Sequence, residues 1–286
     1  AVDGKAAVEI DSSLLPEGKQ FVVNLNGCLV EGFGRGSVSN NMLFNHKKGS
    51  KASVFVNGTK AVSTIAELNA ATDTEIYLAG KFIDDAILAK SNKKYIGFEG
   101  GVVGCINLNG ADYVTLKDIK FDAQYAKRGY DGKGNKKQYA NIITGDNVNK
   151  PNKGAHNLVI EACTFQGTFA DGGGAIAFTD QGRTGSGNIT IKGCTFNTEN
   201  AYFDIYTYYS GNNGYFCIEK NIFNTPFQKT PNTYPIFLGK YQSSTPVVVK
   251  DNQFNTVSTQ EKAVYLQAHS SSYSVSIDAS GNTFGN

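Results

Sequence analysis

The hydrophobic residues in the second half of the chain follow one pattern that recurs at a nearly constant period. Each copy has apolar residues at its first and third positions, Cys or Asn at its sixth and Phe at its eighth. Four copies fit fully: 158–165, 189–196, 216–223 and 247–254. A last copy at 275–284 has two extra residues before its Asn, and an early copy at 114–121 has Ile at the sixth position. From Phe165 the repeated Phe falls 31, 27, 31 and 30 residues apart, a period typical of stacked solenoid units.

Each copy predicts a strand, a corner and a second strand. Its two apolar residues alternate with other residues, which is the period of a strand with one buried face. If the copies stack in parallel about 4.8 Å apart, the Phe side chains form an interior column, in which each contributes roughly 1.5–3 kcal/mol by burial. The sixth positions form a second column at the corner, where an inward Asn can hydrogen-bond to the backbone of the next rung. That column would hold Cys163, Cys194, Asn221, Asn252 and Asn282. We therefore predict an all-β parallel β-helix.

A helical pattern precedes these repeats. Ser63 with Glu67 gives an N-cap signal, and Ile65, Leu68 and Ala71 line one face at helical spacing. We predict that this amphipathic helix caps the solenoid, covering its apolar end and its unpaired strand edge. Residues 1–60 are expected to be an N-terminal segment of strands or cap, and residues 61–286 the β-helix domain.

A second family of strand-like segments lies between the repeats, at 176–178, 205–207, 236–238 and 264–266. If their flanking apolar positions point inward, an outward column results. Its members are Ala177, Tyr206, Phe237 and Tyr265, with Asp204 and Tyr208 beside them. Aromatic residues on a rigid sheet can bind sugar rings on their flat faces, or they can pack against a partner or a long loop. The candidate substrate-binding residues are Tyr206, Tyr208, Tyr265 and Lys240, and self-association through this column is the alternative.

Composition limits the classes of partner. The chain has 286 residues and a net charge of +2, so no broad positive field favours nucleic acid or an anionic membrane. No apolar run approaches the roughly 20 residues needed to span a bilayer. The five Cys residues show no CxxC spacing, and buried thiols are the simplest interpretation. A disulfide between Cys163 and Cys194 on neighbouring rungs is the alternative. Whether a leader once preceded Ala1 stays open.

Residues 61–121 resemble the opening of the pectate lyase family. The match consists of the helical segment, the Thr-Glu-Ile-Tyr-Leu-Ala-Gly run at 74–80 and the Ser-Asn-Lys-Lys-Tyr-Ile-Gly run at 91–97, followed by the strand pattern at 112–121. The family has Ser-Asn-Lys-Thr-Ile-Ile-Gly at the second run, and the likeness extends loosely to about residue 256. This resemblance implies a right-handed parallel β-helix, secreted or at the cell surface, that cleaves an acidic polysaccharide such as pectate by calcium-assisted β-elimination.

The resemblance also implies site residues. Asp171 and Asp204 would face calcium, which neutralises the uronate carboxylate. Lys229 would stand where the family has its basic residue and would take the proton α to that carboxyl, which requires a lowered lysine pKa. Other positions depart from the family: 159–162 lacks its His, and a further acid position falls on Ala175.

Because the acid set is depleted, a second function from another class stands beside the lyase. It is a non-catalytic β-helix, such as an adhesin, a fibre-type subunit or a glycan-binding module, with the aromatic column as its contact surface. The two differ around Lys229. A lyase needs at least two carboxylates converging there, whereas a binding protein needs only aromatic residues. The fold alone does not decide between them.

Overall fold

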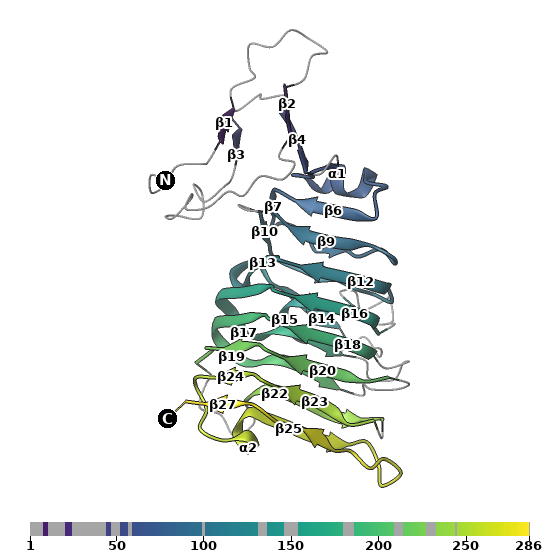
Figure 1. Cartoon of the computed structure of the whole chain (residues 1–286), viewed down its shortest axis with the longest axis vertical. Helices are drawn as coiled ribbons and strands as arrows, with labels where there is room; N and C mark the ends of the chain where they lie inside the picture. Colours follow the sequence, from purple (N-terminus) through teal and green to yellow (C-terminus); the bar gives the residue numbers. More distant parts are fainter. Residues whose placement is uncertain are drawn as a thin grey trace.

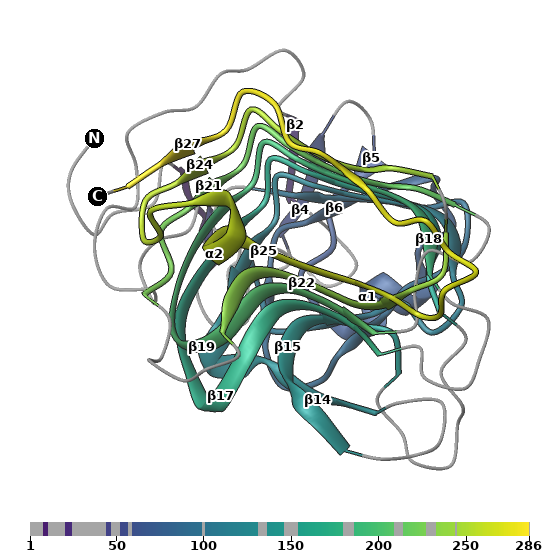
Figure 2. The same cartoon turned by 90° about the horizontal axis from the view of Figure 1, so that it is seen from below.

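The computed structural model describes residues 8–10, 21–24, 44–46, 52–56, 59–98, 101–130, 136–145, 154–179, 186–208, 214–226, 233–243 and 245–285. From residue 61 onward, each strand of a wall pairs in parallel with the equivalent strand one turn later. The turns, or rungs, build an elongated stack (Figure 1). Seen along the stack, the rungs superpose as one coil (Figure 2). The prediction of an all-β parallel β-helix is confirmed.

Three walls form the coil. The first is an eight-stranded sheet of β6 (Glu75–Leu78), β9 (Lys94–Gly97), β12 (Asp112–Lys117), β16 (His156–Glu161), β18 (Gly187–Lys192), β20 (Phe216–Glu219), β23 (Val247–Lys250) and β26 (Ile277–Asp278). The second contains β7 (Lys81–Phe82), β10 (Val102–Val103), β13 (Lys120–Asp122), β17 (Thr164–Thr179), β19 (Thr195–Tyr208), β21 (Ile222–Phe223), β24 (Gln253–Phe254) and β27 (Thr283–Phe284). The third contains β8 (Ile87–Leu88), β11 (Ile106–Asn107), β15 (Lys136–Ile143), β22 (Tyr234–Tyr241) and β25 (Val264–Ala268). The long strands β17 and β19 bend through the corner and belong to both the second and third walls.

Other elements lie around this coil. Strand β14 (Lys127–Tyr130) pairs antiparallel with β15 and lies outside the coil (Figure 2). The short helices are η1 (Ala123–Tyr125) and α2 (Gln260–Ala263). Within 1–60, the described strands form two sheets separate from the walls: β1 (Val8–Ile10) with β3 (Phe44–His46), and β2 (Phe21–Asn24) with β4 (Ala52–Val56) and β5 (Thr59–Lys60). Among the described helices, none is long and apolar enough to cross a membrane.

The interior Phe column forms as predicted. Strand register aligns Phe121, Phe165, Phe196, Phe223, Phe254 and Phe284. The first five are fully buried. Their ring centroids lie 4.7–4.9 Å apart, with interplanar angles of 1–7°. The repeated Phe therefore lies at the same register position on successive rungs from Phe121 onward.

The corner column also forms. The Asn252 Oδ1 accepts the backbone N–H of Asn221 at 3.0 Å, and its Nδ2 donates to the carbonyl of Ile218 at 2.9 Å. Asn221 and Asn282 make the same two kinds of bond. Each amide thus satisfies one donor and one acceptor that the turn leaves unpaired.

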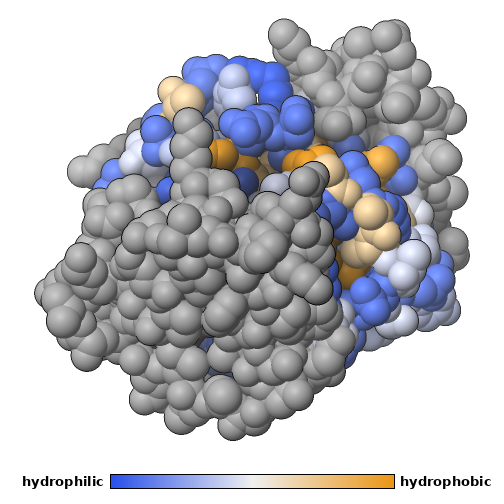
Figure 3. Space-filling view, turned by 90° about the horizontal axis from the view of Figure 1, so that it is seen from above, coloured by the Kyte–Doolittle hydropathy of each residue, from blue (hydrophilic) through white to orange (hydrophobic). Residues whose placement is uncertain are grey.

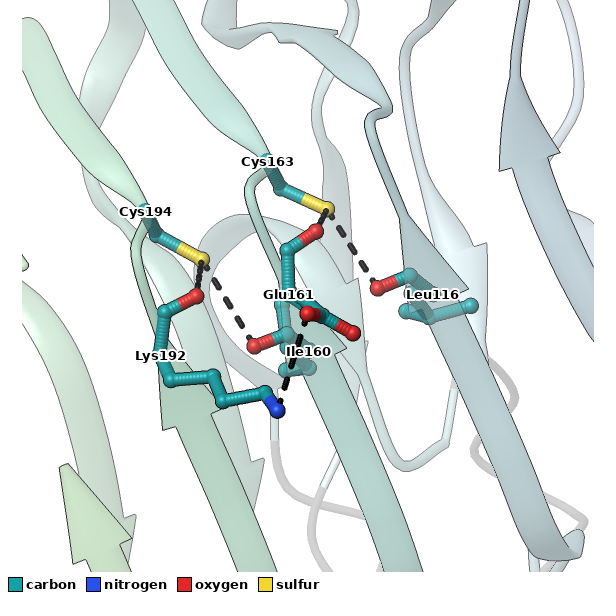
Figure 4. Close-up of polar contacts among 6 residues, drawn as sticks. All are labelled: Leu116, Ile160, Glu161, Cys163, Lys192 and Cys194. Atoms are coloured by element: carbon teal, nitrogen blue, oxygen red, sulfur yellow. Dashed lines mark hydrogen bonds and ion pairs between the residues drawn. The ribbon is translucent and has the colours of Figure 1, made fainter. Parts of the chain in front are cut away.

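Thiols take the place of the amide in the earlier rungs (Figure 4). Cys194 Sγ lies 3.7 Å from the Ile160 carbonyl, and Cys163 Sγ lies 3.6 Å from the Leu116 carbonyl, the positions equivalent to the acceptors of the Asn amides. The four described cysteines are free thiols. Burial, together with the adjacent Cys194 thiol, raises the pKa of Cys163. The buried-thiol interpretation therefore holds for this pair.

The predicted helix is α1 (Ile65–Ala70), which lies at the start of the stack next to β6 (Figure 1). Its N-cap is Thr64, not Ser63: the Thr64 side chain accepts from the Glu67 N–H, and the Glu67 carboxylate accepts from Ser63. This reciprocal arrangement resembles a capping box. Leu68 is buried in the interior core. Seen from this end, the described surface is mostly hydrophilic, with a few hydrophobic residues among it (Figure 3).

Candidate functional site

Six aromatic side chains gather on the third wall, and we refer to them as the aromatic surface. They are Phe203, Tyr206 and Tyr208 of β19, Tyr234 and Phe237 of β22, and Tyr265 of β25. Register aligns Ala177, Tyr206, Phe237 and Tyr265 on successive rungs, as the alternation predicts. Their neighbours Ile205, Ile236 and Leu238 are fully buried. Except for Phe203, which is buried, the six side chains are half-buried.

The rings of this surface stack on each other. Tyr206 and Phe237 have centroids 5.2 Å apart, and Phe237 and Tyr265 have centroids 4.6 Å apart, at interplanar angles of 16° and 13°. A flat face of Tyr206 and both flat faces of Phe237 therefore contact other rings. Tyr265 stands on the last described strand of this wall, so no ring of a further described rung stacks on its second flat face. The centroid of the Tyr234 ring lies 5.4 Å from that of the Tyr265 ring, and the two ring planes differ by 42°.

A broader patch forms where Tyr208 lies beside Tyr206. Their centroids are 6.3 Å apart and their planes differ by 3°, so the two rings extend along one strand. Gly239 on the next rung leaves space for these rings, because a Cβ there would lie 2.7 Å from ring atoms of both Tyr208 and Phe237. In the preceding rung, a Cβ on Gly174 would lie 2.2 Å from the Phe203 ring. The glycine run that follows Asp171 thus makes room for rings.

Lys240 lies at the edge of the same surface. It has a positive φ of 53° at the point where the register of β22 and β25 shifts. The irregularity shifts the alternation of inward and outward side chains by one residue. Tyr241, which follows Lys240, is therefore fully buried and packs edge-on against Phe216, with the ring centroids 5.9 Å apart. Lys240 itself is half-buried one strand position from Gly239.

Asp171 lies on the outside, with 73% of its side chain exposed. Its Oδ2 accepts a hydrogen bond from Arg128 Nη2 at 2.8 Å. The Arg128 guanidinium also lies 4.4 Å from the centroid of the Tyr139 ring. This carboxylate raises the pKa of Arg128. Asp171 is therefore paired with a cation supplied by the hairpin of β14 and β15.

Asp204 was expected on the outward side, and that orientation is wrong. The side chain is fully buried, and Ala175, which occupies the equivalent position in the preceding rung, belongs to the interior core. Its Oδ1 accepts a hydrogen bond from Thr225 Oγ1 at 2.6 Å. Burial raises the pKa of Asp204 to about 8, although the Thr225 hydroxyl acts in the opposite direction. At neutral pH this carboxyl therefore keeps its proton.

The residues implied as calcium ligands do not fit a common site. Asp171 is exposed and paired with Arg128, whereas Asp204 is buried inside the coil, so the two carboxyls lie on opposite sides of the wall. The part of the chain that the structure describes contains no group of three or more His, Cys, Asp or Glu side chains that could hold a metal ion. Lys229 lies outside the described residues, and its predicted role stays a prediction.

The chain matches no family model, and a search of curated proteins gives no match either. The site therefore rests on its own geometry. Sequence reasoning found Tyr206, Tyr208 and Tyr265 but missed two rings beside them, Phe203 and Tyr234, and the partner of Asp171, which is Arg128. The glycine run on the preceding rung could have revealed Phe203, because stacked strands place a glycine where a ring on the next strand needs room.

Proposed function

We propose that the protein is a non-catalytic β-helix that binds polysaccharide through the aromatic surface. The observation that carries this proposal is the position of the rings: five half-buried aromatic side chains lie on one wall of a rigid solenoid. The interior core does not need them, because the inward residues of the same strands already fill it. Amphipathic aromatic residues are suited to contacts that combine apolar packing with hydrogen bonds.

The stacking favours particular contacts. Because Tyr206 and Phe237 cover each other, a sugar ring would stack on the face of Tyr265 that Phe237 does not cover, and would lie along the rims of the other rings. Tyr206, Tyr208 and Tyr265 each carry a phenolic group that can donate and accept hydrogen bonds with sugar hydroxyls. Lys240 supplies a positive charge at the edge, which favours an acidic polysaccharide. Such a ligand fits a protein that is secreted or held at the cell surface.

Affinity electrophoresis against neutral and acidic polysaccharides tests this proposal. The variant Tyr265→Ala should weaken binding about tenfold, as expected when an anchoring aromatic residue is lost. Tyr215→Ala is the matched control, because Tyr215 is 43% exposed on another part of the coil. Equal binding by both variants, or no binding to any polysaccharide by the wild type, would reject the proposal.

A polyuronate lyase is the second candidate. The observation that favours it is the exposed carboxylate of Asp171, which would have to leave Arg128 to act as the calcium ligand that the pectate lyase resemblance implies. The same samples can be incubated with polyuronates, with calcium and then with a chelator, while the ultraviolet absorbance of unsaturated product is followed. Product that disappears with chelator and in Lys229→Ala would favour the lyase over the binding protein.

A further inference from the structure

The outward face of the first wall presents three regular columns of side chains, because parallel register stacks its strands rung on rung (Figure 1). The middle column is small and half-buried, and contains Thr115, Val159, Thr190, Cys217 and Val248. The column at the carboxyl end of the strands alternates in charge, and contains Lys117, Glu161, Lys192, Glu219 and Lys250. The column at the start of the strands contains Tyr113, Asn157, Asn188 and Tyr215.

The two tyrosines of this face are not explained by the fold. Tyr113 is 61% exposed and Tyr215 is 43% exposed, and they are two of the four large hydrophobic side chains that the described residues expose. Tyr113 also has a φ of 54°, in the left-handed region. Asn157 and Asn188 share this conformation, which asparagine adopts readily and a bulky side chain does not. An exposed aromatic residue in a strained conformation points to a contact outside the chain.

The face is also self-complementary. The centre of the eight-stranded wall lies between β16 and β18, with three further strands on each side. A two-fold axis there, parallel to the strands, would bring a second copy face to face and reverse the order of its rungs. Glu161 would then face Lys192 of the second copy, and Lys117 would face Glu219. The same axis sets Tyr113 against Tyr215, whereas an axis along the stack would set the charged column against the tyrosines.

The area of the wall is sufficient for such a contact. Eight strands about 4.8 Å apart, each about 15 Å long, give a face of roughly 600 Å². Two such faces bury about 1,200 Å², which reaches the size of specific interfaces. At the ends of the wall, Lys94 pairs with Glu75 at 2.8 Å and Lys250 pairs with Asp278, so these charges are balanced within each chain.

We propose that the protein forms a two-fold symmetric homodimer through the outward face of the first wall. The charge pairs lie at one rim of this face, so salt should weaken the dimer. The aromatic surface belongs to the third wall, and each copy keeps its own. The inference therefore does not depend on the polysaccharide proposal.

Sedimentation velocity of the full chain over a range of concentrations tests it. The wild type should dimerise reversibly, with a dissociation constant that rises with salt. Glu219→Lys sets a lysine against Lys117 of the second copy at two symmetric points, and should raise the dissociation constant at least about tenfold. Adding Lys117→Glu should restore the dimer. This rescue cannot act within one chain, because the two residues stand three rungs or about 14 Å apart, beyond the screening length of about 8 Å at physiological salt.

Glu199→Lys is the matched control, because this exposed glutamate of β19 lies outside the first wall, and it should leave the dissociation constant unchanged. Tyr113→Asn is a second test that does not depend on charge. It should weaken the dimer without lowering the melting temperature of the monomer, because asparagine suits the positive φ. A wild type that stays monomeric up to about 1 mM would overturn the proposal. So would a double variant that dimerises no better than Glu219→Lys alone, or a Tyr113→Asn variant that dimerises like the wild type.

Discussion

Two aromatic columns run along this molecule, and they differ in what their rings contact. The interior Phe column repeats one residue type on successive rungs from Phe121 to Phe284, is fully buried from Phe121 to Phe254, and has interplanar angles of 1–7° over that part. The aromatic surface mixes Tyr with Phe, is largely half-buried, and has angles of 13–16° between the rings stacked on successive rungs. Closure of the coil requires the first column and does not require the second. Stability therefore explains the interior rings, and the proposed polysaccharide ligand would account for the outer ones.

The largest effect on stability is expected in the interior Phe column. Phe196→Ala should lower the free energy of unfolding by about 3–5 kcal/mol, because it removes a fully buried ring stacked on two neighbours. Urea unfolding followed by circular dichroism measures this change. A loss below about 1 kcal/mol would mean that the column does not hold the rungs together.

The corner column should come next. Asn252→Ala removes the acceptor for the Asn221 N–H and the donor for the Ile218 carbonyl, which leaves two buried backbone groups unpaired. The expected loss is about 2–4 kcal/mol in the same unfolding experiment. Asn255→Ala is the control, because that amide is exposed and bonds only to side chains. An equal effect at both positions would contradict the role of the column.

The buried carboxyl of Asp204 should make stability depend on pH. Its pKa rises from 3.8 to about 8 on folding, so between these values the folded protein binds more protons than the unfolded chain. The contribution of Asp204 to stability is therefore present at low pH and is lost as pH rises through this window, by roughly 1 kcal/mol per pH unit. Asp204→Asn should remove that slope and should be more stable than wild type at the upper end. Parallel pH profiles of the two proteins would show that the carboxyl is not buried.

The aromatic surface should contribute least to the stability of the fold. Phe237→Ala should cost only about 1–2 kcal/mol, since it removes ring stacking and a half-buried side chain, yet it should weaken polysaccharide binding about tenfold. Unfolding and binding measured on the same sample separate the two effects. A loss of stability as large as that of Phe196→Ala would mean that the outer rings are part of the core.

The period of the repeat was enough to predict both interior columns, because Phe165, Phe196 and their equivalents recur at fixed offsets from two apolar residues. The outward position of Tyr206 followed from alternation along its strand. The same rule failed for Asp204, because β19 bends there and both Asp204 and Ile205 are buried. Nor does the sequence reveal that Tyr206 and Phe237 cover each other's faces, since side-chain rotamers are set by the neighbouring rungs and by glycines such as Gly239.

Nuclear magnetic resonance of ring-labelled tyrosines tests the central claim most directly. The chain has 15 Tyr and no Trp, and single Tyr→Phe variants assign the signals. On addition of the polysaccharide that binds, the signals of Tyr206, Tyr208 and Tyr265 should shift, while those of Tyr215 and of the buried Tyr95 should not. Shifts at Tyr215 with none on the aromatic surface, or no shift with any polysaccharide, would contradict the assignment of this surface as the binding site.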